Sequence, residues 1–293
     1  MTKKFSGGYL PAVLQLGKIK ISVPVALTGF LGYFRGDGSF SEQLAFTISG
    51  IFFMAMGSSA INQIQERDID RQMERTAARP IPSGRLPLSQ AIAYAVAFSA
   101  GGLALLFMTE SLIAALLGAF TLAWYNLVYT PLKKITPFAV LPGAIIGALP
   151  PLIGWTAAGQ SLFEKEILFI SFFLFIGQMP HYWLLLIKVG DEFKNAGLPV
   201  ITELLSKDQL RKISFIWMIA ASVSVVIFPA AGIMHSYIIA FIMIAGVLIF
   251  GLIILRITIK GDMLKNWRKL FITENLFYLY IITILIADKY IVL

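Results

Sequence analysis

Long runs of apolar residues recur through the whole sequence, and no other feature constrains the fold as strongly. A helix of about 20 apolar residues crosses the hydrocarbon core of a bilayer, and membrane helices tolerate Pro and Gly within such a run. Only 14% of the residues are charged, whereas a soluble domain carries roughly a quarter. The sequence therefore predicts an all-α, polytopic membrane protein. Its predicted spans lie at 19–35, 43–64, 88–108, 111–129, 138–158, 166–187, 212–232, 236–256 and 271–290.

Basic residues gather on one side of these spans. With the N-terminus in the cytoplasm, only Arg35, Lys165 and Lys289 of the 24 Lys and Arg residues fall on the outer side. Lys and Arg accumulate on cytoplasmic loops, so we expect this orientation. We interpret the net charge of +8 as a sign of topology, with no nucleic-acid partner. The inner segments are then 1–18, 65–87, 130–137, 188–211 and 257–270. The long loops 65–87 and 188–211 are expected to carry function.

Three oxygen-bearing side chains are spaced by four residues at the inner end of the second span. Asn62, Glu66 and Asp70 drift only about 40° around a helix at each step, while rising about 6 Å, so they can face one cavity. Mg²⁺ takes such ligands, usually one or two carboxylates together with substrate phosphates. The alternative is a solvated helix end with paired charges. We favour the metal interpretation because the stripe continues into a membrane helix, where polar groups are costly.

Basic residues accompany this stripe and a second acidic cluster. Arg67, Arg71, Arg75 and Arg79 follow the stripe and are candidates to bind phosphate oxygens. The second cluster, at the inner end of the span 166–187, offers carboxylates for another cation and lysines for phosphate, although an ordinary charged loop would look the same. Its members are Lys188, Asp191, Glu192 and Lys194.

Three further positions are candidates with plain structural alternatives. Tyr129 and Lys133 share a helix face and could bind phosphate, or they could be an interfacial aromatic residue and a snorkelling lysine. His181, inside the span 166–187, could bind haem iron or a polar group of a substrate, or it could be a packing residue. For Glu274, near the inner start of the last span, we expect neutralisation by Lys269 or Arg268.

Several stretches resemble the UbiA superfamily of intramembrane prenyltransferases, and together they are most similar to its protohaem IX farnesyltransferase branch. They are ERDIDRQMERT at 66–76 with Arg-Pro at 79–80 and SGR at 83–85, YTPLKKITP at 129–137, GALPPLIGW at 147–155, QMPHYW at 178–183 and DEFKNAGLP at 191–199. The resemblance implies one domain, 1–293, of nine helices around a central cavity in a prokaryotic plasma (inner) membrane, with its active loops facing the cytoplasm.

The resemblance also implies a reaction: Mg²⁺-dependent farnesyl transfer from farnesyl diphosphate to a vinyl group of haem b, which gives haem O. His181 is the expected haem contact. The expected metal ligands are Asn62, Glu66, Asp70, Asp191 and Glu192. The expected catalytic residues are Asn62, Glu66, Asp70, Lys133 and Asp191. The expected diphosphate-binding residues are Arg67, Arg71, Tyr129, Lys188 and Lys194.

Some positions depart from the pattern of the family. Glu66 stands where Asp is usual, Ala139 where Asn is usual, Pro142 where Gly is usual, and Gly177 where an aromatic residue precedes Gln178. These departures leave open a different acceptor, such as an aromatic quinone precursor, or a catalytically impaired haem-binding or assembly protein. A transporter is the remaining alternative, but it would place its charges nearer the bilayer midplane. Expected partners are the bilayer and haem A synthase or oxidase assembly proteins.

Overall fold

A computed structural model describes residues 8–259 and 267–291, so parts of the predicted inner segments 1–18 and 257–270 lie outside the described residues. Within these ranges the chain is helical and contains no strand. The long helices are α2 (Ile19–Arg35), α3 (Glu42–Gln65), α6 (Leu88–Phe107), α7 (Leu112–Ala123), α9 (Val140–Ala157), α10 (Lys165–Asn195), α11 (Lys207–Ala230), α12 (Tyr237–Ile259) and α13 (Trp267–Tyr290). The short ones are α1 (Tyr9–Leu16), α4 (Arg67–Asp70), α5 (Glu74–Ala77), η1 (Trp124–Tyr129), α8 (Thr130–Leu132), η2 (Pro137–Ala139) and η3 (Ile201–Glu203).

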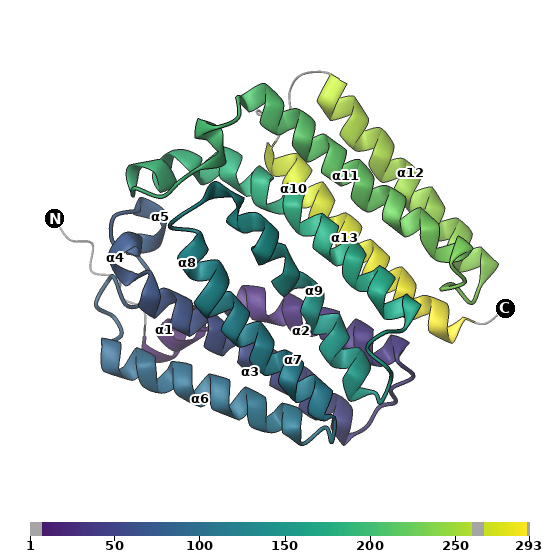
Figure 1. The fold of residues 1–293 in the computed structure, drawn as a ribbon, viewed down its shortest axis with the longest axis horizontal. Helices are drawn as coiled ribbons and strands as arrows, with labels where there is room; N and C mark the ends of the chain where they lie inside the picture. The colour runs from purple at the N-terminus through teal and green to yellow at the C-terminus, as the bar shows by residue number, and fades with distance from the viewer. Residues whose placement is uncertain (1–7, 260–266, 292–293) are drawn as a thin grey trace.

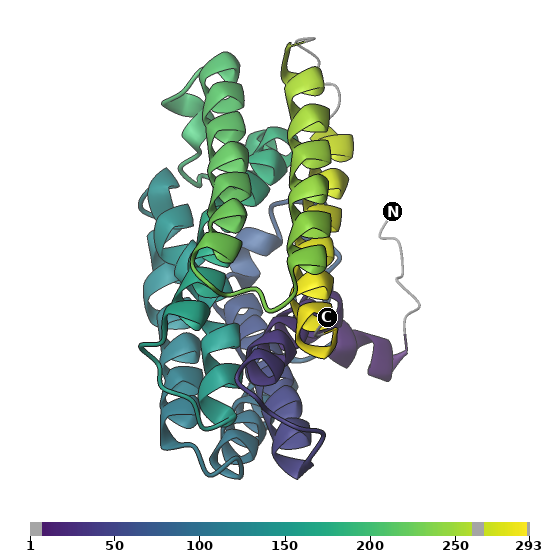
Figure 2. The ribbon, with the colours of Figure 1, turned by 90° about the vertical axis from the view of Figure 1, so that its right-hand side faces the viewer.

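Eight described helical segments are long and apolar enough to cross a membrane, and one of them joins α7, η1 and α8 into the span Leu112–Leu132. The helices α1 and α2 meet at a bend of 49° and supply a ninth span when taken together. The prediction of an all-α membrane fold is confirmed, and nine spans are consistent with it. In Figure 1 the helices α10 to α13 form one part of the bundle, beside α2, α3, α6, α7 and α9. Figure 2 shows α1 turning away from the bundle.

Local sequence signals explain where several helices begin and end. The hydroxyls of Ser41, Ser111 and Ser206 cap α3, α7 and α11 by accepting a backbone N–H of the first turn. The helix α10 continues eight residues beyond the predicted end of its span, through the second acidic cluster, because nothing breaks it before Gly197. That glycine has φ +73°, a conformation that ends a helix at little steric cost. The cluster is therefore part of a rigid helix rather than a loop.

Small residues allow α2 and α9 to pack closely. A Cβ atom on Gly154 would overlap the backbone oxygen of Gly29, and one on Gly32 would overlap the backbone of Pro151. Close backbone approach at small residues is how helices associate in a bilayer, where lipid tails remove the hydrophobic drive. This contact fixes the relative position of two helices that line the apolar cavity described below.

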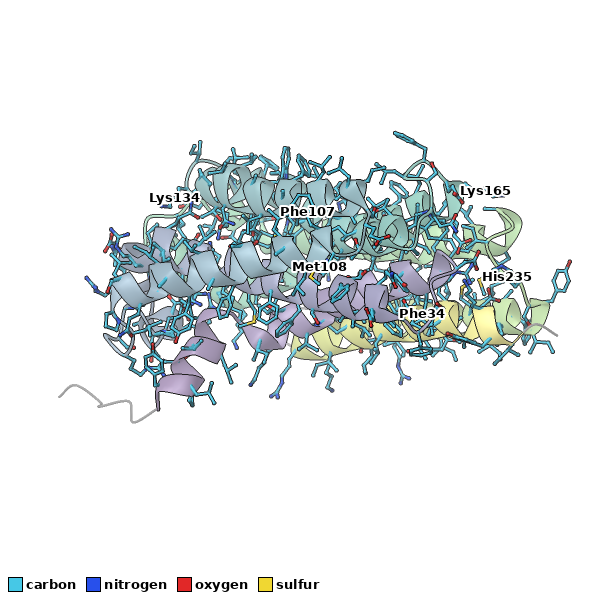
Figure 3. All side chains as sticks on the ribbon, turned by 90° about the horizontal axis from the view of Figure 1, so that it is seen from below. Phe34, Phe107, Met108, Lys134, Lys165 and His235 are labelled. Atoms are coloured by element: carbon cyan, nitrogen blue, oxygen red, sulfur yellow. The ribbon has the colours of Figure 1, made fainter. Side chains whose placement is uncertain are left out.

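A buried ionic cluster joins the C-terminal helices to α2 at the end of the bundle that carries Lys165 and His235, opposite to Lys134 (Figure 3). Arg35 of α2 donates from Nη1 to Asp288 Oδ2 of α13 at 3.0 Å and from Nη2 to the Ile233 carbonyl at 2.6 Å. It also pairs with Glu166 at the start of α10. Because both Arg35 and Asp288 have fully buried side chains, the cluster fixes four elements relative to one another.

Candidate active site

A cavity of about 910 Å³ lies at the end of the bundle where α3 and α8 finish. Its wall includes five of the predicted site residues, which are Asn62, Glu66, Asp70, Tyr129 and Lys133. Residues far apart in the sequence complete the wall: Lys18, Arg75, Arg79, Tyr125 and Tyr182. The cavity therefore combines oxygen ligands, cations and phenol groups within one lining.

The acidic stripe faces this cavity because the helical path continues beyond α3. The backbone N–H of Glu66 bonds to the Asn62 carbonyl at 2.9 Å, and that of Asp70 bonds to the Glu66 carbonyl at 2.7 Å. Residues four apart therefore stay on one side of the helical path, although α3 ends at Gln65 and α4 begins at Arg67. All three predicted ligands share one wall, as the spacing indicated.

Each member of the stripe contacts a basic side chain of the protein. Lys18 Nζ donates to Asn62 Oδ1 at 3.0 Å, and Lys133 Nζ lies 2.6 Å from Glu66 Oε1. Arg79 Nη1 donates to both carboxylate oxygens of Asp70, at 2.7 and 2.5 Å.

These contacts decide how the acidic groups ionise. Burial alone would raise the pKa of Glu66, but the charge and hydrogen bond of Lys133 outweigh it and hold that pKa below its usual value. Burial would lower the pKa of Lys133, yet the Glu66 carboxylate raises it. For Asp70 burial outweighs Arg79, so its pKa is raised. Glu66 and Lys133 are thus held as an ion pair, whereas at Asp70 burial opposes the effect of the Arg79 contact.

Arg75 lies between the two acidic clusters. Its pKa is lowered by burial and by neighbouring Arg79, while Glu192 of α10 and the carboxylates of Asp70 and Glu66 act in the opposite direction. Glu192 Oε2 is buried and has no hydrogen-bond partner among the described residues. An unpartnered buried carboxylate oxygen is costly, so Glu192 leaves an unsatisfied acceptor near the end of α10.

The other predicted residues of the diphosphate site lie outside the lining of the cavity. Lys188 sits over the Trp267 ring, 5.1 Å from its centroid, and Lys194 pairs with Glu203 at 3.2 Å. Asp191 is exposed, as is Arg71. Arg67 donates to the carbonyl of Ile64 at 3.0 Å. Their roles at the site stay predictions.

Lys18 is a functional candidate that sequence reasoning missed, as are Tyr125 and Tyr182 of the same cavity wall. Lys18 approaches Asn62 from 44 positions away, across the bend between α1 and α2. Its backbone is left-handed, with φ 47°, a conformation that costs a non-glycine residue about 1–3 kcal/mol and is concentrated at functional sites. In the sequence, a basic residue just before a span is normally interpreted as a signal of membrane orientation. Only the bend between α1 and α2 shows that Lys18 belongs to the site.

A second cavity of about 350 Å³ continues into the apolar interior. It shares Lys18, Ile21, Tyr125 and Tyr129 with the first. Its deeper lining includes Met54, Ile51, Ile146, Pro150 and Leu174. Both shared tyrosines belong to the π-helical turn η1, and such turns are frequent at functional sites. The two cavities therefore offer a charged mouth and an apolar chamber, and Tyr125 and Tyr129 line both of them.

His181 lies in α10 beside these cavities without lining either. Its ring packs on Phe271 of α13 with centroids 4.6 Å apart, and its Nδ1 is 3.9 Å from Glu274 Oε2. The expectation that Lys269 or Arg268 neutralises Glu274 was wrong. Glu274 is fully buried and turned into the bundle, where its Oε2 has no hydrogen-bond partner among the described residues.

The structure shows the contacts around three residues that depart from the family pattern. Gly177 leaves space for Tyr278, whose hydroxyl would overlap a Cβ atom at position 177 and donates to the Gly177 carbonyl at 3.1 Å. The carbonyl of Pro142 accepts a hydrogen bond from Trp124 Nε1 at 2.8 Å. Ala139 is buried in η2, and it does not line either cavity.

Comparisons with known proteins agree with this arrangement. Residues 22–281 match the model of the UbiA prenyltransferase family. The protoheme IX farnesyltransferase of Geobacter sulfurreducens is 41% identical over 187 residues, which cover 64% of this chain and 69% of that protein. The solved UbiA homologue of Aeropyrum pernix K1 superposes with a TM-score of 0.73 at 22% identity, over 92% of this chain and 97% of that one. A UbiA homologue of Archaeoglobus fulgidus, solved bound to GPP and Mg²⁺, gives a TM-score of 0.67 at 19% identity, over 96% and 100%.

Proposed function

The chain belongs to the UbiA prenyltransferase family, and from this premise we propose that it transfers a farnesyl group from farnesyl diphosphate to a vinyl group of haem b, giving haem O. One observation carries the proposal: the charged mouth, with its acidic stripe and cations, opens directly into an apolar chamber. A prenyl diphosphate has the same two parts in the same order. The names of the curated relatives support haem as the acceptor.

The donor set at the mouth fits Mg²⁺. Amide and carboxylate oxygens are its preferred ligands, and substrate phosphates usually complete its coordination. Asn62, Glu66 and Asp70 would hold the ion, with Asp191 and Glu192 contributing from α10. No three His, Asp or Glu side chains in the described ranges form a preassembled cluster, which favours a site completed by the diphosphate. Bound there, Mg²⁺ would neutralise negative charge on the diphosphate.

The cations of the mouth stabilise the leaving group. As the allylic C–O bond breaks, its electron pair stays on the diphosphate, and Lys18, Lys133, Arg75 and Arg79 stand around the cavity that receives this charge. Donors that are already in place cost no reorganisation at the moment of reaction. The apolar chamber keeps water from the allylic cation until the vinyl carbon of the acceptor attacks it, after which water adds to give the hydroxyl group of haem O.

The acceptor is proposed to approach through His181. This residue is three positions after Gln178 and four before Leu185, which line the inner and outer cavities. Residues at these spacings share one side of a helix. A haem held by His181 would therefore lie beside the level where the two cavities join.

Incubation of the purified chain with farnesyl diphosphate, Mg²⁺ and haem b, followed by mass analysis, tests the proposal. The expected product is haem carrying one hydroxylated farnesyl adduct. Asp70→Asn should abolish its formation while the protein keeps its elution volume and melting temperature. Exclusive prenylation of an added aromatic acceptor, or normal turnover by the Asp70→Asn variant, would refute the assignment.

We also propose the orientation and the membrane. Lys134 marks one end of the bundle, and Lys165 and His235 mark the other (Figure 3). The bias of basic residues supports placing the Lys134 end in the cytoplasm of a prokaryote with the protein in the plasma membrane. Haem A synthase or oxidase assembly proteins are the proposed partners for passing on the product. A membrane-impermeant thiol reagent is applied to the Lys134→Cys variant. Labelling only after the membrane is permeabilised would support this orientation, and labelling in intact cells would contradict it.

A further inference from the structure

A buried carboxylate on α13 has no role in the reaction as described so far. Glu274 is fully buried within an apolar helix, where ionisable groups are expensive and usually functional. Its Oε1 is 3.4 Å from the Tyr278 hydroxyl, whereas its Oε2 has no hydrogen-bond partner in the described part of the chain. The imidazole of His181 lies near this oxygen, with its Nδ1 3.9 Å from Oε2.

We propose that Glu274 is a positioning residue for His181. Its Oε2 accepts the Nδ1–H of the imidazole, which fixes the tautomer that leaves Nε2 free to bind the iron of the haem acceptor. The inference rests on the proposed function, because it needs haem as the acceptor. A histidine that ligates a metal nearly always donates its other ring N–H to a carboxylate or carbonyl, and this partner orients the ring and raises its basicity.

The surroundings of the pair suit this role. Phe271 covers one face of the His181 ring, so rotation of the imidazole is restricted. One third of the His181 side chain is exposed, so the imidazole is not fully enclosed by protein. The 3.9 Å separation is longer than a hydrogen bond, and a shift of about 1 Å closes it. Such bonds are often long before substrate binds.

Tyr278 and Gly177 explain how the carboxylate is held in place. The Tyr278 hydroxyl lies within hydrogen-bond distance of both Glu274 Oε1 and the Gly177 carbonyl. A side chain at position 177 would displace Tyr278. The missing aromatic residue at 177, noted in the sequence as a departure, is thus replaced in space by a tyrosine that anchors the proposed partner of His181.

Haem binding by the purified full-length protein tests the inference without turnover. Ferric haem b is titrated into wild type, Glu274→Gln, Glu274→Leu, Glu274→Asp and His181→Ala, and the Fe–His stretching mode of the ferrous complexes is recorded by resonance Raman spectroscopy. We expect Glu274→Gln and Glu274→Leu to weaken haem binding about 10–100-fold and to lower the Fe–His frequency, because the ligand loses anionic character. Glu274→Asp should restore part of both. Asp288→Asn is the matched control, since it neutralises another buried carboxylate of α13 far from His181.

The outcomes separate the inference from the proposed function. If His181→Ala keeps the wild-type Fe–His mode, His181 is not the haem ligand and the role of Glu274 falls, while haem as the acceptor is still decided by the product analysis above. If His181→Ala removes the mode while Glu274→Gln and Glu274→Leu keep wild-type affinity and frequency, the positioning role is overturned and the acceptor assignment stands. If Asp288→Asn changes the frequency as much as Glu274→Gln, the effect is one of stability and the inference is likewise overturned.

Discussion

Two consecutive lysines at the end of α8 provide a stringent test of the site. Lys133 lines the charged mouth and pairs with Glu66 at 2.6 Å, with only 19% of its side chain exposed. Lys134 points to the surface, where its Nζ meets the carbonyl of Gln65 at 3.4 Å. Substituting each by methionine removes the same charge from adjacent positions, so the two variants differ mainly in whether the cavity loses a cation.

The expected magnitude follows from the role of a preorganised donor. Removing one such donor from a water-excluded site costs about 10²–10³-fold in kcat, and Lys133→Met additionally leaves the Glu66 carboxylate with its closest cation gone. We expect a loss in this range for Lys133→Met and a change of less than about threefold for Lys134→Met, since single exposed charges contribute little. Lys133→Arg keeps the charge, although with a different geometry, and should recover part of the activity.

Steady-state formation of farnesylated haem, measured at saturating Mg²⁺ and farnesyl diphosphate, reports kcat for all three variants. Equal midpoints of thermal unfolding for wild type and variants, measured in the detergent of the assay, exclude a folding defect. Equal turnover by Lys133→Met and Lys134→Met would refute the role of the Lys133 cation. A drop that appears only in KM would show that this lysine binds donor and transition state equally.

Three further predictions address stability and specificity. Arg35→Met should lower the free energy of unfolding by about 3–5 kcal/mol because it strands a buried carboxylate, whereas Lys289→Met should cost about 0–1 kcal/mol; equal melting temperatures would contradict the buried cluster. Gly177→Trp should destabilise the protein by displacing Tyr278, and Tyr278→Ala in the same chain should restore much of the loss, as a double-mutant cycle would show. Met54→Trp fills part of the apolar chamber, so it should favour a shorter prenyl diphosphate over the farnesyl donor; an unchanged ratio of the two kcat/KM values would count against that chamber as the tail site.

The fold and part of the site were accessible from the sequence for clear physical reasons. Apolar runs identify spans because a bilayer sets their length, and α2 begins and ends where predicted, at Ile19 and Arg35. The stripe of Asn62, Glu66 and Asp70 was accessible because helical periodicity is a local property that persists across the junction of α3 and α4.

What escaped prediction depends on contacts between distant segments. Lys18 joins the mouth only because α1 and α2 meet at a bend that brings it to Asn62. Lys188, counted among the diphosphate ligands, lies over Trp267 of α13. The environment of Glu274 was misjudged because nearby Lys269 and Arg268 are neighbours in sequence, whereas the packing of α13 on α10 turns the carboxylate towards His181.

The left-handed backbone of Lys18 has an evolutionary consequence. A glycine would adopt φ 47° with far less strain, so a lysine at this bend costs stability but keeps a basic side chain against Asn62. Selection for heat resistance alone would push this position towards glycine, and selection for turnover would push it back.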